Sequence, residues 1–279
     1  MNVRIITDSS ADLRMGLGAE IPFVPLTINF GEEEFVDNVT MSRREFYEHL
    51  QVCKELPKTS QPTPDAFAQA YQKAVDAGEK VVVLTISSKL SGTFQSANIA
   101  AMDFPGQVYV VDTRSAAIGV GVLAEYANGL AKQGLSAEEI VAKLETEKHN
   151  VVLLAALDTL DYLVRGGRLS KVAGIAGGLL NIKPVITLEN GEIIVAGKAR
   201  GTKQANAMMN KGVAGVGGVD TTKPMLFGFT GLSDDLLQKY LSESAAVYGD
   251  AQLDSTLISG AIGTHVGPGA YAVAFFKNA

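Results

Sequence analysis

The segment that most constrains the fold is residues 81–97, where an apolar run passes through a hydroxyl-rich loop into a helical pattern. Its sequence is VVVLTISSKLSGTFQSA. A continuous apolar run of this length is typical of a strand in a parallel sheet that helices cover on both faces. A strand that enters a helix through serine, glycine and threonine also gathers free backbone N–H groups and hydroxyls, which can hold a small anion without a lysine. The segment therefore predicts an α/β fold with a polar site where this strand ends.

The first half of the chain repeats this alternation of strands and helices. Ser42 with Glu45 and Ser136 with Glu139 have capping-box spacing, and Pro64 follows the candidate cap Thr63. We predict that residues 1–157 form an N-terminal domain, a parallel-sheet sandwich with helices on both faces, with a less regular edge hairpin in 22–38. The expected strands are 3–7, 23–28, 80–86, 107–112 and 151–157, and the expected helices are 42–52, 64–77, 92–102, 115–133 and 137–148.

The second half, residues 158–279, predicts a mixed α/β domain. Residues 183–199 read as a hairpin, because Asn190-Gly191 is a favoured two-residue turn between two β-like runs. The apolar stretch 172–180 consists mostly of small residues, which fits either close helix packing or room for an apolar ligand. The other expected elements are helices at 202–214 and 233–247 and strands at 225–230, 252–258 and 270–276.

Composition narrows the class of protein. Hydrophobic residues make up 47% of the chain and charged residues 19%, which indicates a globular protein with ample core material. The formal charge of −6 argues against a nucleic-acid partner. Cys53 is the single cysteine, so no internal disulfide can form, as is usual in a reducing cytoplasm. The first residues read as a strand and not as a signal peptide, and no apolar stretch is long enough to cross a membrane. We expect a cytoplasmic protein.

Polar segments adjoin several of the expected strands. We expect loops at 7–10, 87–93 and 112–115, which follow strands, and at 263–269, which precedes the last strand and contains His265. The carboxyl ends of parallel strands share one edge of a sheet, so the first three segments should meet there. Segment 58–64 adds Thr59, Ser60 and Gln61 before a helix. Each segment alone could simply cap a helix, but together they favour a polar site.

Five charged or titratable side chains are candidates for this site or for a partner. His265 lies among glycines and could orient a ligand oxygen, act as a base or serve only the core. Arg165, Arg168 and Lys171 surround the Gly166-Gly167 turn, either as solvated surface charge or as a docking patch for an acidic partner or a phosphate. Arg200 follows the hairpin and could help to neutralise an anion.

Catalytic templates give one alternative. The sequence has no Gly-x-Ser-x-Gly elbow, no Gly-x-x-x-x-Gly-Lys phosphate loop and no histidine–acid spacing typical of a metal site. We therefore expect no metal and no cofactor. A hydrolase or transferase stays open, with Ser91 or Ser9 as nucleophile and His265 as base. Asp112 or Asp8 would then orient the imidazole.

The ordered set of motifs resembles the DegV family of bacterial fatty-acid-binding proteins. The motifs span almost the whole chain, with Ser10 where a threonine is common and Thr113 where a serine is common. The matching segments are TDSSADL at 7–13, TSQP at 59–62, SSKLSGTFQSA at 87–97, VDT at 111–113, RGGRLS at 165–170, KPV at 183–185, RG at 200–201 and HVGPGA at 265–270.

The resemblance implies a two-domain carrier that encloses one long-chain fatty acid between its domains and is not itself an enzyme. It presents the carboxyl group to a separate fatty acid kinase and carries the acyl phosphate toward phospholipid synthesis, with transient membrane contact allowed. A lipid-responsive regulator would share the same site. By motif, Ser91 and Thr59 hold the carboxyl group. The full implied set is Thr59, Ser60, Ser91, Gly92, Thr93, Arg200 and His265 for the ligand, and Arg165, Arg168 and Lys171 for docking the kinase.

Overall fold

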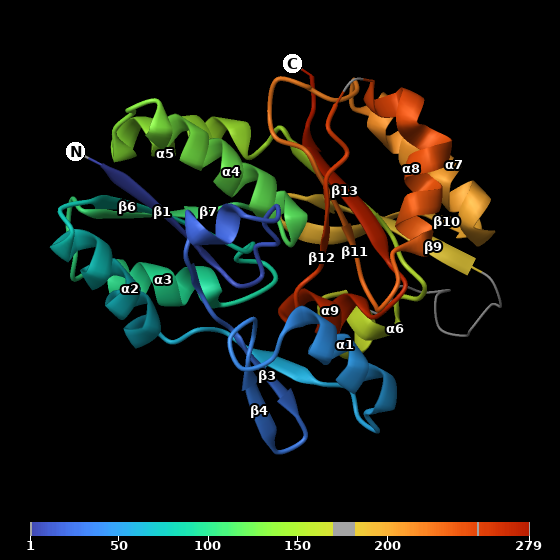
Figure 1. Ribbon diagram of the computed structural model, residues 1–279, viewed down its shortest axis with the longest axis horizontal. Coiled ribbons are helices and arrows are strands. Elements are labelled where there is room, and N and C mark those ends of the chain that lie inside the picture. Colours follow the sequence, from blue (N-terminus) through green and yellow to red (C-terminus); the bar gives the residue numbers. More distant parts are fainter. Residues whose placement is uncertain (1, 170–181, 250, 279) are drawn as a thin grey trace.

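The structure, a computed structural model, describes residues 2–169, 182–249 and 251–278. These residues form a four-stranded, a six-stranded and a three-stranded sheet, with helices packed around and between them (Figure 1). No helix in the described ranges combines the length and hydropathy needed to cross a membrane. The small-residue stretch 172–180 and Lys171 lie outside the described residues.

The four-stranded sheet is parallel throughout and has the strand order β2-β1-β6-β7. Val81 and Val83 pack in the cluster on one face, while Val82 and Leu84 pack in the cluster on the other, so the apolar run is buried on both sides. Helices α2 and α3 cover one face, and α4 and α5 cover the opposite face (Figure 1). The predicted sandwich is confirmed. Its elements are β1 (Val3–Asp8), β2 (Phe23–Val24), β6 (Lys80–Thr85), β7 (Val108–Asp112), α2 (Pro64–Asp76), α3 (Thr93–Ala101), α4 (Ile118–Lys132) and α5 (Ala137–Glu147).

The six-stranded sheet is mixed and has the order β10-β9-β8-β13-β11-β12. Helices α7 and α8 cover one of its faces (Figure 1). The expected hairpin is present, with Asn190 and Gly191 at positive φ in the turn. Its elements are β8 (Val151–Ala156), β9 (Ile182–Glu189), β10 (Glu192–Arg200), β11 (Leu226–Phe229), β12 (Ser255–Leu257), β13 (Tyr271–Phe276), α7 (Gly201–Gly215) and α8 (Asp235–Tyr248).

One strand assignment is wrong. The strand predicted at 151–157 was placed in the parallel sheet, but β8 pairs antiparallel with β9 and β13 in the mixed sheet. Its continuous apolar run is explained by burial on both faces, which either sheet provides. The division at 157/158 therefore stays a proposal, and the pairing of β8 favours a boundary before Val151.

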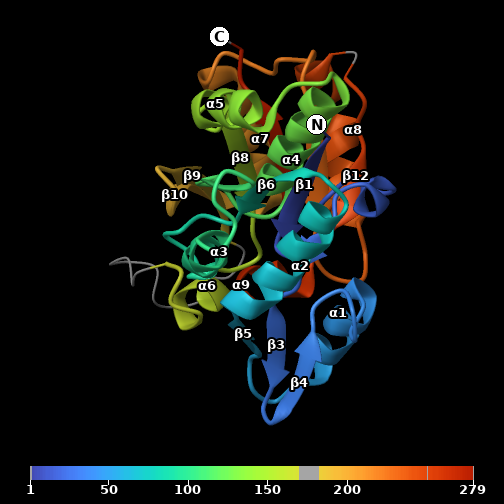
Figure 2. The same cartoon turned by 90° about the vertical axis from the view of Figure 1, so that its left-hand side faces the viewer.

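The small sheet has the order β4-β3-β5 and carries α1 against it, at one end of the molecule (Figure 2). Within segment 22–38, residues 27–36 form a hairpin in this small sheet, whereas Phe23–Val24 is the edge strand β2 of the parallel sheet. The elements here are β3 (Thr27–Phe30), β4 (Glu33–Val36), β5 (Lys58–Ser60) and α1 (Arg43–Val52).

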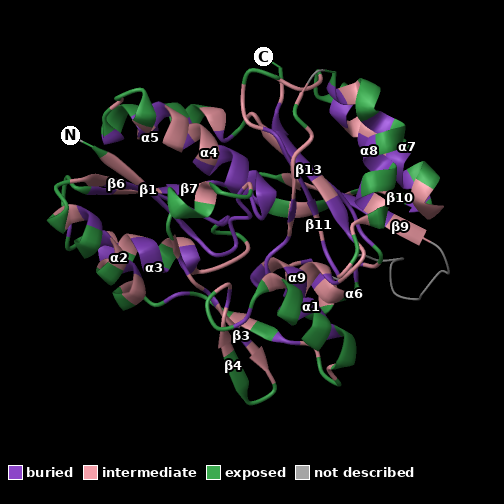
Figure 3. Cartoon of the chain, in the orientation of Figure 1, coloured by how far each residue is buried: buried purple, intermediate pink, exposed green. Residues whose placement is uncertain are grey.

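Helix α4 links the two large sheets. It contacts β1 and β6 of the parallel sheet and β8, β11 and β13 of the mixed sheet. Every residue from 118 to 124 is buried, as expected for a helix enclosed on all sides (Figure 3). The short elements η1 (Leu17–Ala19), α6 (Asp161–Arg165) and α9 (Gly260–Val266) complete the described fold.

Candidate functional site

An apolar cavity lies between the parallel and mixed sheets, with an empty volume of about 870 Å³ counted out to its opening. Loops of the parallel sheet, strands of the mixed sheet and α9 all contribute to its wall. Because the lining is mostly aliphatic, its chemistry suits an apolar ligand. The principal lining residues are Ser10, Leu26, Thr59, Ile86, Leu90, Ser91, Ala116, Ala117, Leu153, Ala155, Leu163, Arg168, Ile186, Leu188, Ile193, Gly228, Ile258, Ala261, Ile262, His265, Val266 and Ala272.

The space arises from a row of small residues across the mixed sheet. Ala155 is paired with Ala272, and Ala272 with Gly228, on three adjacent strands. Directly opposite residues point to the same face, so three minimal side chains lie side by side over the cavity. The missing side-chain volume on this face is therefore encoded locally.

Leucines close one end of the cavity. Leu153 lies two residues before Ala155 on β8, and Leu188 lies two residues after Ile186 on the antiparallel β9. Both leucines are therefore displaced toward the same end of the cavity, by roughly 7 Å. The same two leucines border a surface pocket lined by polar residues including Arg114. They therefore separate the cavity from solvent at this end.

Polar side chains line the opposite end. His265 Nε2 and Thr59 Oγ1 are 2.9 Å apart, and Ser91 Oγ lies 2.8 Å from Thr93 Oγ1. The Arg168 guanidinium donates to the carbonyl oxygens of Leu90 at 3.2 Å and Gly166 at 2.6 Å. Within the described chain, no acidic side chain pairs with it. The polar end thus carries a positive charge that a ligand anion could offset.

Burial sets the charge state of this end. Burial, together with the nearby Arg168 charge, lowers the pKa of His265 to about 4, so the imidazole is neutral at pH 7. Burial also lowers the pKa of Arg168, which still stays charged. His265 Nδ1 is buried without a partner in the described structure and packs closely against Gly166.

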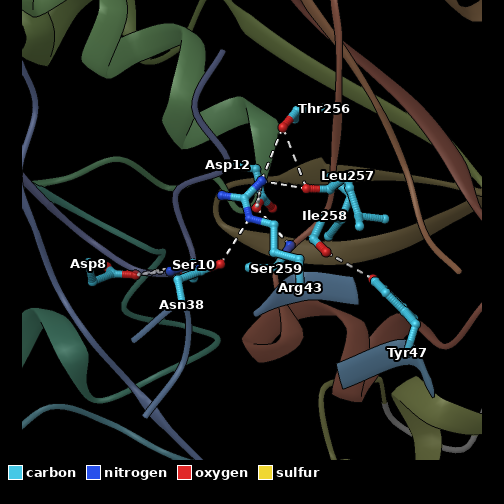
Figure 4. A network of polar contacts seen from close by, with 10 residues as sticks. All are labelled: Asp8, Ser10, Asp12, Asn38, Arg43, Tyr47, Thr256, Leu257, Ile258 and Ser259. Atoms are coloured by element: carbon cyan, nitrogen blue, oxygen red, sulfur yellow. Dashed lines mark hydrogen bonds and ion pairs between the residues drawn. The ribbon is translucent and has the colours of Figure 1, made fainter. Parts of the chain in front are cut away.

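Asp8 joins the polar segments that follow the strands of the parallel sheet. The Ser10 hydroxyl and the backbone N–H of Ile86 both donate to its carboxylate, the latter at 2.9 Å (Figure 4 shows the Ser10 contact). The Ser87 N–H donates to the Ser115 carbonyl at 2.8 Å. The three segments therefore meet at one edge, as the parallel order predicts. Burial raises the pKa of Asp8.

The structure brings part of the predicted ligand set to the cavity. Thr59, Ser91 and His265 line it, and Thr93 lies directly behind Ser91. Gly92 does not line it, but a Cβ there would lie 2.0 Å from Gln61 Oε1, so glycine allows segment 58–64 to approach.

Two further predicted ligand residues, Ser60 and Arg200, lie away from the cavity. Ser60 is exposed on β5. Arg200 is exposed at the end of β10, where its backbone N–H donates to Gln204 Oε1 at 2.6 Å. The glycines around His265 predicted a loop, but His265 lies on the helix α9 and reaches the cavity from there.

The predicted docking residues lie in different places. Arg168 lines both the cavity and an adjoining polar pocket that opens beside His265 and Thr59, whereas Arg165 lines only the polar pocket. Lys171 lies outside the described residues. Sequence reasoning missed the cavity role of Arg168, because nothing in its spacing showed that it would be half-buried. It also missed the small-residue row, whose signal was the alternation of Ala270, Ala272 and Ala274.

The hydrogen bonds of the described residues do not join Ser91, His265 and Asp8 into a catalytic triad. A serine hydrolase needs its base bonded to the nucleophile and to an orienting acid. His265 is hydrogen-bonded to Thr59, and Ser91 is hydrogen-bonded to Thr93. Asp8 is bonded to Ser10 and Ile86, and His265 Nδ1 faces no acid among the described residues. Those residues also contain no cluster of three or more His, Cys, Asp or Glu side chains that could hold a metal.

Two large β-sheets flanked by helices enclose an apolar cavity with one polar end. This architecture places the chain among α/β proteins with an internal cavity. Residues 2–278 match the sequence profile of the DegV family, described as uncharacterised proteins, and the chain belongs to that family. A DegV domain-containing protein of Deinococcus radiodurans is 39% identical over 211 residues, 74% of each chain.

Solved structures share the complete fold. A fatty-acid-binding DegV family protein of Thermus thermophilus matches with a TM-score of 0.89 and 32% identity over 100% of both chains. The fatty acid kinase (Fak) B3 protein of Streptococcus pneumoniae, loaded with linoleic acid, matches with a TM-score of 0.86 and 28% identity, again over 100% of both chains.

Proposed function

We propose that this protein binds one long-chain fatty acid in the cavity and acts as a non-catalytic, cytoplasmic carrier. The observation that carries the proposal is the shape of the cavity: aliphatic along its length, closed by Leu153 and Leu188, and polar and cationic where Arg168 lies. Such a cavity is complementary to a chain with one acidic end. The fatty-acid-bound relatives of the same fold support this assignment.

The tail supplies most of the binding free energy. Burial of each methylene contributes about 0.8 kcal/mol, so a dozen contribute roughly 10 kcal/mol before the costs of association. The head group then needs only moderate contacts. This suits a carrier, because a carboxylate that must react later has to stay accessible.

The head group would be held by hydroxyls around one cation. A proton on His265 Nδ1 would be buried without an acceptor, so we assign the proton to Nε2, which then donates to Thr59 Oγ1. That leaves the Thr59 hydroxyl proton free for the ligand carboxylate. Ser91 supplies a second hydroxyl, and Arg168 offsets the charge.

The adjoining polar pocket would give a kinase access to the carboxyl group. It is lined by the cationic residues Lys54, Lys58 and Arg165 together with the acidic Glu55, and it shares Thr59, Arg168 and His265 with the cavity. A pocket of this charge suits phosphate, which fits the proposed transfer to an acyl phosphate by a separate fatty acid kinase. The likeness to the Streptococcus pneumoniae protein supports this partner.

Extraction tests the proposal directly. We expect organic extraction of the purified protein to release a long-chain fatty acid in about equimolar amount, identified by mass spectrometry. The delipidated protein should then bind added fatty acid with a stoichiometry of one. Protein that is empty after purification and binds no fatty acid in titration would exclude this function.

Replacing Ser91 by alanine should weaken binding without unfolding the chain. A hydrogen bond to a charged group contributes about 1.5–3 kcal/mol, so we expect the Kd to rise roughly tenfold to hundredfold. Ser88→Ala is the matched control, since this exposed serine of the same loop contacts Asp112 and not the cavity. Equal affinities of the two variants would remove Ser91 from the head-group site.

A further inference from the structure

A buried charge cluster lies beside α9, outside the cavity. It contains two carboxyl groups, Asp12 after β1 and Asp37 after β4, and one guanidinium, Arg43 at the start of α1. Asp12 is 0% exposed and Asp37 is 1% exposed. Arg43 Nη1 lies 3.4 Å from Asp12 Oδ1 (Figure 4). One positive charge therefore faces two acidic groups.

Arg43 also donates hydrogen bonds to Asn38, which follows β4, and to β12. Its Nε donates to Asn38 Oδ1 at 3.0 Å, and Nη1 donates to Thr256 Oγ1 at 3.1 Å and to the Leu257 carbonyl (Figure 4). The guanidinium thus fastens α1 to β12. It cannot turn fully toward either carboxylate without losing these bonds.

Both carboxyl groups hold the start of α9. The N–H of Ser259 donates to Asp12 Oδ1 at 2.8 Å. The backbone N–H groups of Gly260 and Ala261 and the Ser9 hydroxyl are the hydrogen-bond partners of Asp37. Ala261, Ile262 and His265 of this helix line the cavity. The position of α9 therefore depends on the two acids.

The cluster leaves two buried carboxyl oxygens, Asp12 Oδ2 and Asp37 Oδ2, without a hydrogen-bond partner, and the buried Ser259 hydroxyl is the donor that lies near Asp12. These two acceptors are costly to bury while both acids are ionised, because the single hydroxyl can supply a donor to only one of them. A single proton on either acid removes the excess negative charge and supplies one missing donor.

We propose that Asp12 and Asp37 are positioning residues that hold α9, and with it His265, at the polar end of the cavity, and that they retain one proton whose loss weakens ligand binding. The proposal concerns how the cavity is kept in shape. Its ligand-binding consequence rests on the proposed function, whereas the retained proton does not.

The titration of the cluster agrees with this geometry. Burial raises the pKa of Asp12 to about 7 and that of Asp37 to about 6, and Arg43 offsets only part of the effect. The titratable groups that face Asp12 are Arg43 and Tyr47 on α1 and Asp37 after β4; burial keeps the phenol of Tyr47 neutral by raising its pKa. A raised carboxyl pKa favours the folded state at low pH, and this contribution is lost as the pH rises to about 7.

Oleate titrations across pH 6 to 9 test the consequence. We expect the affinity of the wild-type protein to fall above pH 7, by up to about tenfold per pH unit. Asp12→Asn supplies a permanent amide donor, so its affinity should match the wild-type value at pH 6 and stay nearly constant. The exposed Asp103→Asn should keep the wild-type profile. A wild-type profile in Asp12→Asn would overturn the coupling of the proton to binding.

Infrared difference spectroscopy tests the proton without any ligand. A protonated-carboxyl band should be present at pH 6, decrease as the pH is raised through about 7, and be reduced in Asp12→Asn. In NMR spectra of the same protein, the chemical shifts of the His265 imidazole should change over the same pH range. No such band at pH 6 would overturn the inference even if oleate binds, whereas a normal band with no oleate binding would count only against the proposed function.

Discussion

Replacing Ala272 by phenylalanine should abolish fatty-acid binding and leave the chain folded. Ala272 is the centre of the small-residue row, paired with Ala155 on one side and Gly228 on the other. A phenyl ring at this position would extend over both neighbours and fill the middle of the cavity. A long acyl chain could then reach neither the leucine end nor its full buried length.

The size of the effect follows from the methylenes displaced. Excluding even four methylenes removes about 3 kcal/mol, and excluding the tail altogether removes roughly 10 kcal/mol, so the Kd should rise at least a hundredfold. Adding a ring to a filled core costs about 1–3 kcal/mol of folding free energy, but here much of the ring enters existing space. The loss of binding should therefore far exceed the loss of stability.

Calorimetric titration with a fatty acid and urea unfolding of the same samples separate the two effects. Ala214→Phe is the matched control, because this alanine is exposed on α7 and faces no cavity. We expect the control to bind as the wild type does. If Ala272→Phe binds with wild-type affinity, the ligand lies elsewhere and the cavity is not the binding site.

The sequence alone was sufficient to predict a strand or the start of a helix where neighbouring residues carry the whole pattern. The apolar run 81–86 needed two buried faces and found them in the middle of the parallel sheet. Ser42 and Ser136 begin α1 and α5 as capping boxes, as their spacing with Glu45 and Glu139 predicts. These features depend on a few neighbouring residues, so they can be read without the fold.

Features that depend on distant segments could not be predicted in this way. The apolar run at 151–156 suits either sheet, and only its pairing with β13, more than 100 residues later, decides between them. The glycines around His265 suggested a loop because glycine is a poor helix former. In the structure Gly263 belongs to α9, where the absence of a side chain allows close packing against α1, whereas Gly267 and Gly269 follow the helix at positive φ.

That packing makes Gly263 a position where a single added methyl group should destabilise the fold. A Cβ at Gly263 would lie 2.7 Å from both Phe46 Cε1 and Tyr47 Oη. Both aromatic residues are buried, and the Tyr47 hydroxyl donates to the Ile258 carbonyl at 3.1 Å. The added methyl would therefore displace α9 or break this hydrogen bond.

Gly263→Ala should lower the free energy of unfolding by about 1–3 kcal/mol despite the better helix propensity of alanine. Gly129→Ala is the matched control, since this glycine also lies inside a helix but has nothing within 4 Å of a new Cβ. The control should gain up to about 1 kcal/mol. Urea unfolding of both variants measures the difference.

The same variant connects the fold to the site. Because α9 carries His265, a displaced helix should also move the imidazole away from Thr59 and weaken fatty-acid binding in Gly263→Ala but not in Gly129→Ala. If Gly263→Ala were as stable as Gly129→Ala, close packing of α9 on α1 would not be a constraint on the fold. If it were less stable but bound with full affinity, the position of His265 would be set by its contact with Thr59 and not by the helix that carries it.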